Sequence, residues 1–360
     1  MRQQFRRTIG ATVLACTAAL SAQDRPDGPR RPVAPGEPIA QLAAAFRTHS
    51  VVTISDPHGN VQLQAFILTL IRDAQFRAVV DDIVLETASA RYQDAIDRYT
   101  RGDAVPPSVL RHAWEDHTAP NSLGQQAAEL LDVVRAVNAS PGTLRKLRVI
   151  AGDPPIDWEN VTSAADHANW IALRDSYPAD TIRRQVIERR RHALVVYGQG
   201  HLQRRQVASN YDMTSWQAQT VVSLLERDTG TQVFNVWTWV DREVDLAELN
   251  SWRIPALAVI KGTTLGGRDF ATYARALLGG NRFAVRNDEL VPITREQWQA
   301  LTMEEQFDAV LYLGPPSTMT YVDIPPALCR DAAFVSERLR RLALAAPPPE
   351  LASFKKACNV

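Results

Sequence analysis

Acidic and imidazole side chains follow four short apolar segments of the chain, at the points where those segments end. The segments VVTI, DIVL, RVIAG and ALVVYGQG are followed in turn by Asp56 and His58, by Glu86, by Asp153, and by His201. Imidazoles and carboxylates are the groups that proteins use for proton transfer and for binding many metal ions. The sequence therefore presents a candidate reactive set, provided that the four segments lie side by side.

The chemistry that this set predicts is hydrolysis. An apolar-periodic helical segment follows His58, and the positive end of that helix would disfavour the protonated imidazole. A neutral imidazole can act as a general base, while a carboxylate from Asp56 or Glu86 would orient the ring and oppose its deprotonation. Water is then the attacking group. Ser55 is an alternative nucleophile, although no G-x-S-x-G elbow surrounds it.

The same residue types also suit a metal ion. His58, His201, Asp56 and Glu86 together offer the nitrogen and oxygen ligands that zinc, iron or manganese accept. The chain has no closely spaced pair such as H-x-x-x-H, so the sequence leaves a divalent metal open as an alternative to metal-free hydrolysis.

The elements that must position these residues alternate between strands and helices. Short apolar runs such as ALVVY and DAVLYL are separated by helical segments, which is typical of a parallel sheet covered on both faces. The sequence predicts an α/β fold with a mostly parallel central sheet, helices on both faces, and an inserted helical lobe at about 90–138. In such a sheet the carboxyl ends of the strands share one edge, where ligands bind.

The N-terminal region predicts export. Residues 1–22 combine three arginines with an apolar run and a small-residue end, which is the pattern of a secretory signal and too short for a membrane span. Lipoprotein processing at Cys16 is an alternative that would add a lipid anchor. Residues 23–38 are rich in proline and predict a linker.

The rest of the chain predicts one α/β domain over 39–345 and a C-terminal tail over 346–360. Outside the predicted signal the cysteines are Cys329 and Cys358, which in an exported protein predict a disulfide that ties the tail to the body. Two free buried thiols are the alternative. The formal net charge is zero, which gives no support for nucleic-acid binding and leaves a small molecule as the expected partner.

The ordered motifs resemble those of the erythromycin esterase and ChaN-like (haem-binding uptake, Tiki) superfamily. ISDPHG stands where that superfamily has a strand ending in an acid and then a histidine, and IVLET stands where it has a strand ending in Leu-Glu. The segments RHAWEDHT, LLDVVRAVN, RVIAGD and RDSYPADTIRRQVIERRRHALVVYGQGHLQRR follow in the same order, so the resemblance runs from about residue 50 to about residue 205. Two positions depart from the esterases: Val61 stands in place of an arginine, and Asp56 is shorter than the glutamate of the motif.

The resemblance implies roles for these residues. His58 would be the base that activates water, Glu86 and Asp56 would support it, and His201 would stabilise the transition state or act as a second base. The remaining candidates would face the substrate or support the residues that do: Ser55, Asp153, Arg174, Asp175, His112 and His117. The esterase branch implies a hydrolase of ester or amide bonds, the ChaN-like branch implies a protein that binds haem or a metal, and a non-catalytic relative is a third alternative.

Overall fold

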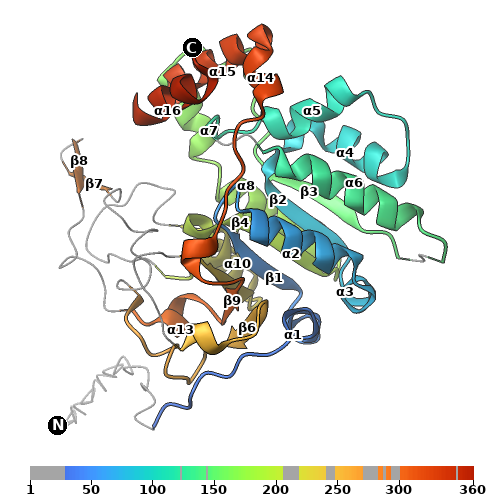
Figure 1. Cartoon of the computed structure of the whole chain (residues 1–360), viewed down its shortest axis with the longest axis vertical. Coiled ribbons are helices and arrows are strands. Elements are labelled where there is room, and N and C mark those ends of the chain that lie inside the picture. Colours follow the sequence, from blue (N-terminus) through green and yellow to red (C-terminus); the bar gives the residue numbers. More distant parts are fainter. Residues whose placement is uncertain are drawn as a thin grey trace, which may run out of the picture.

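A seven-stranded sheet forms the centre of the protein (Figure 1). The computed structural model describes residues 29–121, 124–142, 145–205, 219–240, 248–270, 283–286, 289–292, 301–345 and 348–360. The sheet has the order β3-β2-β4-β1-β5-β9-β6, in which β6 runs antiparallel to β9 and every other neighbouring pair is parallel. The predicted α/β fold with a mostly parallel sheet is confirmed.

The strands are short and almost entirely buried. They are β1 (Val51–Asp56), β2 (Asp82–Ser89), β3 (Arg148–Asp153), β4 (Ala193–Gly198), β5 (Phe234–Trp239), β6 (Ala256–Val259) and β9 (Ala309–Tyr312). A separate antiparallel pair comprises β7 (Phe283–Arg286) and β8 (Glu289–Pro292).

The helices fall into three groups. The first group contains α1 (Pro38–Ala45), α2 (Val61–Arg72), α3 (Ala74–Val79), α4 (Gln93–Arg101), α5 (Pro107–Glu115) and α6 (Gln126–Ala139). The second contains α8 (Ser176–Ile182), the π-helical turn η2 (Arg183–Ile187), α10 (Val221–Thr229) and α13 (Met303–Gln306). The third contains α7 (Ala164–Ile171), α14 (Pro326–Arg330), α15 (Ala332–Ala345) and α16 (Pro348–Cys358). Short 3₁₀ turns are η1 (Ala90–Tyr92), η3 (Gln199–Leu202), η4 (Leu249–Ser251) and η6 (Pro316–Thr318).

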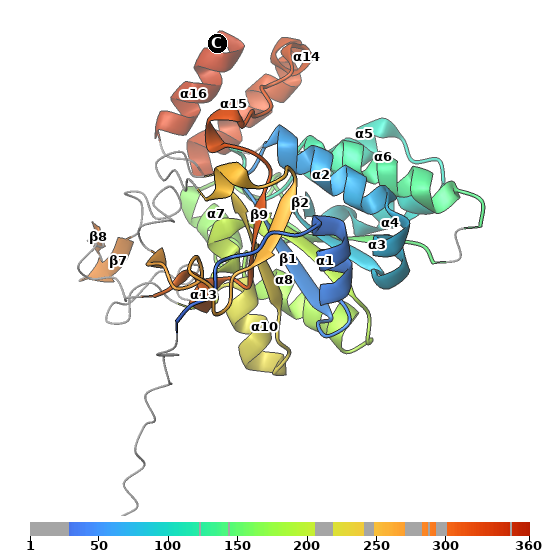
Figure 2. The same ribbon diagram turned by 60° about the horizontal axis from the view of Figure 1, so that its bottom comes forward.

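Both faces of the sheet are buried because alternate strand residues point in opposite directions. Val52 and Ile54 belong to the apolar cluster that includes residues of α1 to α6, whereas Val51 and Val195 belong to the cluster that includes residues of α8 and α10. Figure 2 shows α2 and α6 on one side of the sheet and α8 and α10 on the other. Burial on both faces explains why these strands read as continuous apolar runs.

The predicted helical lobe is continuous with the first helical layer. Residues 90–138 include α4, α5 and most of α6, and these helices pack against β2, β3 and α2. They therefore cover the sheet beside the strands that carry Glu86 and Asp153.

The segment before α1 lies extended along the body. The Arg31 N–H donates to the carbonyl of Gly262 (3.2 Å), Gly36 pairs with Leu257 of β6, and the Arg30 guanidinium is 2.9 Å from Glu304. This is the part of the predicted linker that the structure describes. The predicted signal over 1–22, with Cys16, lies outside the described residues.

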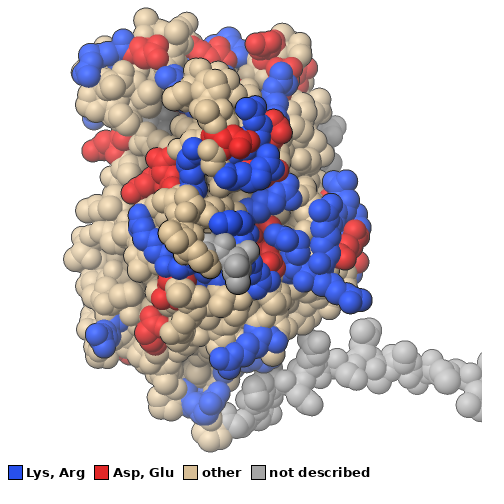
Figure 3. All heavy atoms as spheres, turned by 90° about the vertical axis from the view of Figure 1, so that its right-hand side faces the viewer, with Lys and Arg blue, Asp and Glu red and all other residues tan. Residues whose placement is uncertain are grey.

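Charged side chains of both signs share the surface. Figure 3 shows lysines and arginines with aspartates and glutamates among them on the face at the right of Figure 1. Arginines near the start of β2 and β3 are paired with carboxylates, since Arg145 lies 2.6 Å from Asp81 and Arg148 lies 3.1 Å from Asp97. Among the residues that the structure describes, no helix is both long enough and apolar enough to span a bilayer.

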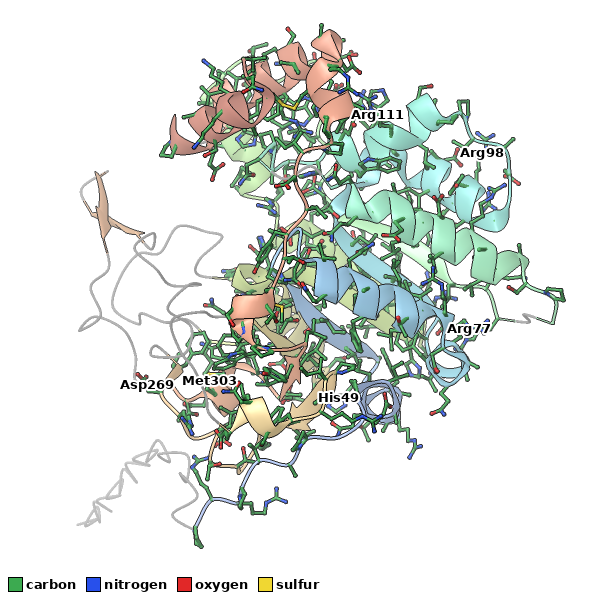
Figure 4. All side chains as sticks on the ribbon, in the orientation of Figure 1. His49, Arg77, Arg98, Arg111, Asp269 and Met303 are labelled. Atoms are coloured by element: carbon green, nitrogen blue, oxygen red, sulfur yellow. A yellow bond between two sulfur atoms is a disulfide. The ribbon has the colours of Figure 1, made fainter. Side chains whose placement is uncertain are left out.

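Helices α14, α15 and α16 form a C-terminal unit with a small core of its own. Phe334, Val335, Leu342 and Phe354 pack together in it, and a disulfide joins Cys329 of α14 to Cys358 of α16. The predicted disulfide is therefore present. Figure 4 shows Arg111 of α5 beside this unit, where its guanidinium lies over the Phe334 ring and 3.6 Å from Asp331.

Arginines of α15 attach the unit to the rest of the chain. Arg338 donates to the carbonyl of Pro120 (2.6 Å), and Arg341 donates to Asp116 (2.7 Å). Both guanidinium groups are largely buried, so these bonds lie in an environment where charge-assisted hydrogen bonds are strong. The unit thereby holds the loop over residues 116–121.

We expect loss of the disulfide to loosen this unit. The bond closes a loop with a sequence separation of 29, for which chain entropy predicts a stabilisation of about 3.5 kcal/mol. The Cys329→Ser/Cys358→Ser double variant should therefore exchange amide hydrogens of α14 to α16 faster than the oxidised protein does. Reductant should have no further effect on that variant, and equal protection in the two proteins would contradict the prediction.

Candidate active site

The four strands with polar ends are neighbours in the sheet, in the order β3-β2-β4-β1, and they all run in parallel. Their carboxyl ends therefore share one edge, as the sequence predicts for the reactive set. A cavity of about 380 Å³ opens at this edge. The predicted site residues that line it are Asp56, His58, Glu86, His117, Arg174 and His201.

Glu86 lies at the centre of this arrangement and is almost fully buried. Its Oε1 accepts a hydrogen bond from the Arg174 guanidinium, and its Oε2 accepts one from the backbone N–H of Gly198. The Nε2 atoms of His201 and His58 lie 3.5 Å and 3.8 Å from the same Oε1. Burial alone would raise the pKa of Glu86, but His58, His201, Arg174 and the Gly198 N–H together lower it to about 2.

Each histidine also has an aspartate behind it. His58 Nδ1 lies 3.1 Å from Asp56, and His201 Nδ1 lies 2.8 Å from Asp175. A carboxylate only accepts hydrogen bonds, so both Nδ1 atoms carry a proton and donate it. The Nε2 atom of each ring, which faces Glu86 and the cavity, is consequently the atom that can exchange a proton with a ligand.

The position of Asp175 explains how His201 is held. Asp175 directly precedes α8, and its Oδ1 also accepts the backbone N–H of Val221, the first residue of α10 (3.1 Å). The free N–H groups at the start of a helix favour a carboxylate there. The start of α10 thus fixes the carboxylate that orients His201.

The backbone around His58 differs from the sequence-based expectation. His58 and Gly59 both have positive φ (37° and 75°), and α2 starts only at Val61, where the Asn60 side chain caps it by accepting the N–H of Leu63 (2.8 Å). His58 therefore lies outside the first turn of α2, where the helix dipole acts.

The protonation of His58 also differs from that expectation. Burial would lower the pKa of His58, but the carboxylates of Glu86 and Asp56 outweigh burial and raise it to about 9. Since 43 % of the side chain remains exposed, solvent screens part of this effect. His58 is thus a cation at neutral pH, and not the neutral imidazole that the helix dipole would favour.

Position 198 leaves little room for a side chain. A Cβ atom there would lie 3.0 Å from His58 Nε2 and 3.1 Å from Glu86 Oε2, so both side chains would have to shift to admit it. Gly198 pairs in register with Asp56 across β4 and β1. The His58 imidazole and the Glu86 carboxylate therefore lie against backbone that carries no side chain.

Asp153 lies deeper, behind Arg174. Its carboxylate accepts two hydrogen bonds from Thr118, from the backbone N–H (2.7 Å) and from the hydroxyl (2.5 Å), and lies 4.0 Å from Arg174 Nε. Burial raises the pKa of Asp153 to about 7, against the opposing influence of Arg174 and the two Thr118 bonds. Asp153 and Glu86 thus flank Arg174 and hold its guanidinium at the cavity wall.

The structure does not bring every predicted residue to the cavity. Ser55 is fully buried, and its hydroxyl accepts the backbone N–H of Thr238 (2.7 Å) in the neighbouring strand. His112 is on α5, where it stacks on Tyr92 and lies 2.9 Å from Asp116. His117 does line the cavity, with its Nδ1 accepting the backbone N–H of Ala119 (3.2 Å).

Other residues that build the site are not predicted from the sequence. Thr118 holds Asp153, the Gly198 N–H holds Glu86, and the Tyr197 ring packs edge-on against His201 with its centroid 6.0 Å away. The Tyr197 hydroxyl is buried without a hydrogen-bond partner among the described residues. Gly198 could have been predicted, because the sequence shows a strand that ends in glycine before His201. Nothing in the sequence indicates Thr118 except its position next to His117.

The donor set does not fit a divalent metal ion. Aspartate-backed imidazoles suit metal ligation, but the Arg174 cation already occupies the Glu86 oxygen that both Nε2 atoms face. A metal ion would have to displace the Arg174 guanidinium from its carboxylate. Within the described ranges, no three His, Cys, Asp or Glu side chains are grouped as ligands of one ion.

Comparison with known proteins gives likenesses of structure. No family model and no curated protein matches the chain. A protein of Bacillus cereus is 12 % identical with a TM-score of 0.47, covering 76 % of this chain and 90 % of that one. The erythromycin esterase EreC, as a variant in its open conformation, is 12 % identical with a TM-score of 0.44, covering 76 % and 92 %. ChaN of Campylobacter jejuni, with cofacially bound haem, is 12 % identical with a TM-score of 0.34, covering 57 % and 87 %.

Both groups of the sequence resemblance are among these matches. The erythromycin esterase and ChaN likenesses concern the arrangement of the chain, and the chemistry has to be sought in the side chains.

The raised pKa of His58 can be measured by NMR titration of its imidazole. Glu86→Gln and Asp56→Asn should each lower this pKa, because the charge of Glu86 and both the charge and the hydrogen bond of Asp56 raise it. Asp175→Asn, which alters the carboxylate behind the other imidazole, is the matched control and should leave the titration of His58 near its original position. Equal titration in all four proteins would contradict the assignment.

The same pKa makes stability depend on pH. The folded value of about 9 exceeds the unfolded value of about 6.5, so this contribution is complete below about pH 6.5 and is lost as the pH rises through about 9. Urea unfolding at about pH 6 and about pH 9.5 should show a larger loss of stability in the wild type than in His58→Gln. An equal loss in the two proteins would show that His58 is not the group responsible.

Proposed function

We propose that this protein is a hydrolase that cleaves a carboxylic ester or amide by direct attack of water. One observation carries the proposal: two aspartate-backed imidazoles direct their Nε2 atoms toward the same buried carboxylate at the wall of one cavity. Such a pair can remove a proton at one position and supply a proton at another within a single site.

The charges divide the roles between the two rings. His58, with a pKa of about 9, holds a proton on Nε2 at neutral pH and serves as the proton donor. His201 Nε2 then accepts the proton of the attacking water. This division reverses the roles suggested by the family resemblance, in which His58 is the base.

The reaction balances with these groups alone. Water oxygen bonds to the carbonyl carbon as its proton passes to His201, and the Arg174 guanidinium stabilises the charge that develops on the carbonyl oxygen. The bond from that carbon to the leaving oxygen or nitrogen then breaks, and the leaving atom takes the proton of His58. The products are an acid and an alcohol or amine, and proton exchange with solvent restores both rings.

The resemblance and the disulfide support two coarser statements. The ordered motifs and the site built from them favour membership of the erythromycin esterase and ChaN-like superfamily. A disulfide between Cys329 and Cys358 favours an oxidising compartment, which agrees with an exported, periplasmic or extracellular protein.

The test is hydrolysis of a panel of nitrophenyl esters and anilides by the full chain and by His58→Gln and His201→Gln. Each variant should lose about 10² to 10⁴ in kcat, the range for a general acid or base. His112→Gln is the matched control, because His112 pairs with Asp116 outside the cavity, and it should keep the wild-type rate. Full activity in both site variants would end the proposal, as would a haem Soret band that depends on His58 in a protein without hydrolytic activity.

The pH profile separates the two roles. With His58 as proton donor, kcat/KM should fall as the pH rises through about 9, because the donor loses its proton there. With His58 as base, kcat/KM should instead rise up to the same pH. The second result would keep hydrolysis and overturn the assignment of roles.

A further inference from the structure

A second cavity, of about 70 Å³, adjoins the catalytic cavity and shares Asp56, His58 and Thr87 with it. Seven polar or charged side chains line it, but so do seven aliphatic ones, which the first cavity largely lacks. The aliphatic ones come from α2, α6, the strands and a distant segment of the chain, and include Leu63, Ile67, Leu85, Leu130, Val196 and Val322. The aliphatic cavity therefore begins at the imidazole that serves as proton donor.

Its outer wall is fixed by a strap, defined here as residues 319–323, which is an extended part of the connection between β9 and α14 (Figure 1). The strap is hydrogen-bonded to the turn that follows His58: Val322 N–H donates to the Gly59 carbonyl (2.9 Å), and Val61 N–H donates to the Thr320 carbonyl (2.9 Å). Because the backbone of the strap is bonded at both Thr320 and Val322, the wall is a built part of the fold.

Two glutamine amides at the wall are engaged, whereas Asn60 Nδ2 and Gln125 Oε1 have no hydrogen-bond partner among the described residues. The Gln64 amide donates to the Gln126 carbonyl (3.0 Å), and the Gln125 amide donates to the strap carbonyl of Asp323 (3.2 Å). A ligand that lies along the aliphatic side chains of this cavity would gain affinity from the burial of apolar surface.

We propose that the aliphatic cavity is a substrate subsite for a short, unbranched alkyl chain on the leaving oxygen of an ester. This rests on the proposed hydrolysis, in which His58 protonates the leaving atom, so that whatever is attached to that atom lies beside His58. The volume gives room for about five water-sized groups, which corresponds to a chain of about four to six carbons.

The substrate series that tests the subsite varies one side of the ester at a time. Across ethyl, butyl, hexyl and octyl acetate, kcat/KM should rise by about fourfold for each methylene until the cavity is full, and should fall for octyl. Ethyl esters of the corresponding acids should show no such optimum. An optimum in the acyl series alone would overturn the placement of the chain on the leaving group.

Variants of α6 test the cavity itself. Leu130→Phe narrows it and should remove the gain from butyl and hexyl chains, while Leu130→Ala should move the optimum to a longer chain. Leu131→Phe is the matched control, because Leu131 is equally buried on the same helix and does not line the cavity, and it should keep the wild-type preference. An unchanged preference in both Leu130 variants would refute the subsite.

Binding of n-butanol and n-hexanol, followed by NMR on the full chain, requires no turnover. Hexanol should bind more tightly than butanol, and Leu130→Phe should weaken both. Alcohol binding without ester cleavage would keep the subsite and refute hydrolysis. Ester cleavage that depends neither on chain length nor on the residue at position 130 would keep hydrolysis and refute the subsite.

Discussion

The buried negative charge of Glu86 is the constraint around which the site is arranged. An isolated carboxylate in an apolar interior would be very costly, so the fold must surround it with cations and hydrogen-bond donors. It does so with Arg174, two imidazoles and the Gly198 N–H, which come from three different parts of the chain. The parallel strands make this possible, because they bring those parts to one edge. The carboxylate in turn helps to keep a proton on His58, against the opposing charge of Arg174.

The sequence was sufficient for the fold class and for the convergence of strand ends. Apolar runs separated by helices implied a parallel sheet, and a parallel sheet implies one shared carboxyl edge, so Asp56, Glu86, Asp153 and His201 could be expected together. The order of the strands could not be read in the same way. That β4 enters between β2 and β1 depends on how the intervening helices pack, which no local pattern records.

The protonation state of His58 could not be predicted from the sequence. The helix end was expected to lower the pKa of His58, and this prediction was wrong. His58 and Gly59 have positive φ angles, and α2 begins only after Asn60, so His58 lies outside the helix. The opposing carboxylates could be named from the sequence, but their relative strength depends on distances and burial. Likewise, Ser55 and His112 have the right side chains for chemistry, and only the direction of their strand or helix turns them away from the cavity.

The arginines of α15 have a consequence for how the protein matures. They hold the loop in which Thr118 donates hydrogen bonds to Asp153. Arg338 nevertheless lies more than two hundred positions after this loop in the sequence. A ribosome will have made every strand of the catalytic edge long before it reaches that helix. In the nascent polypeptide the loop that carries Thr118 therefore stays without its Arg338 contact until α15 has been synthesised.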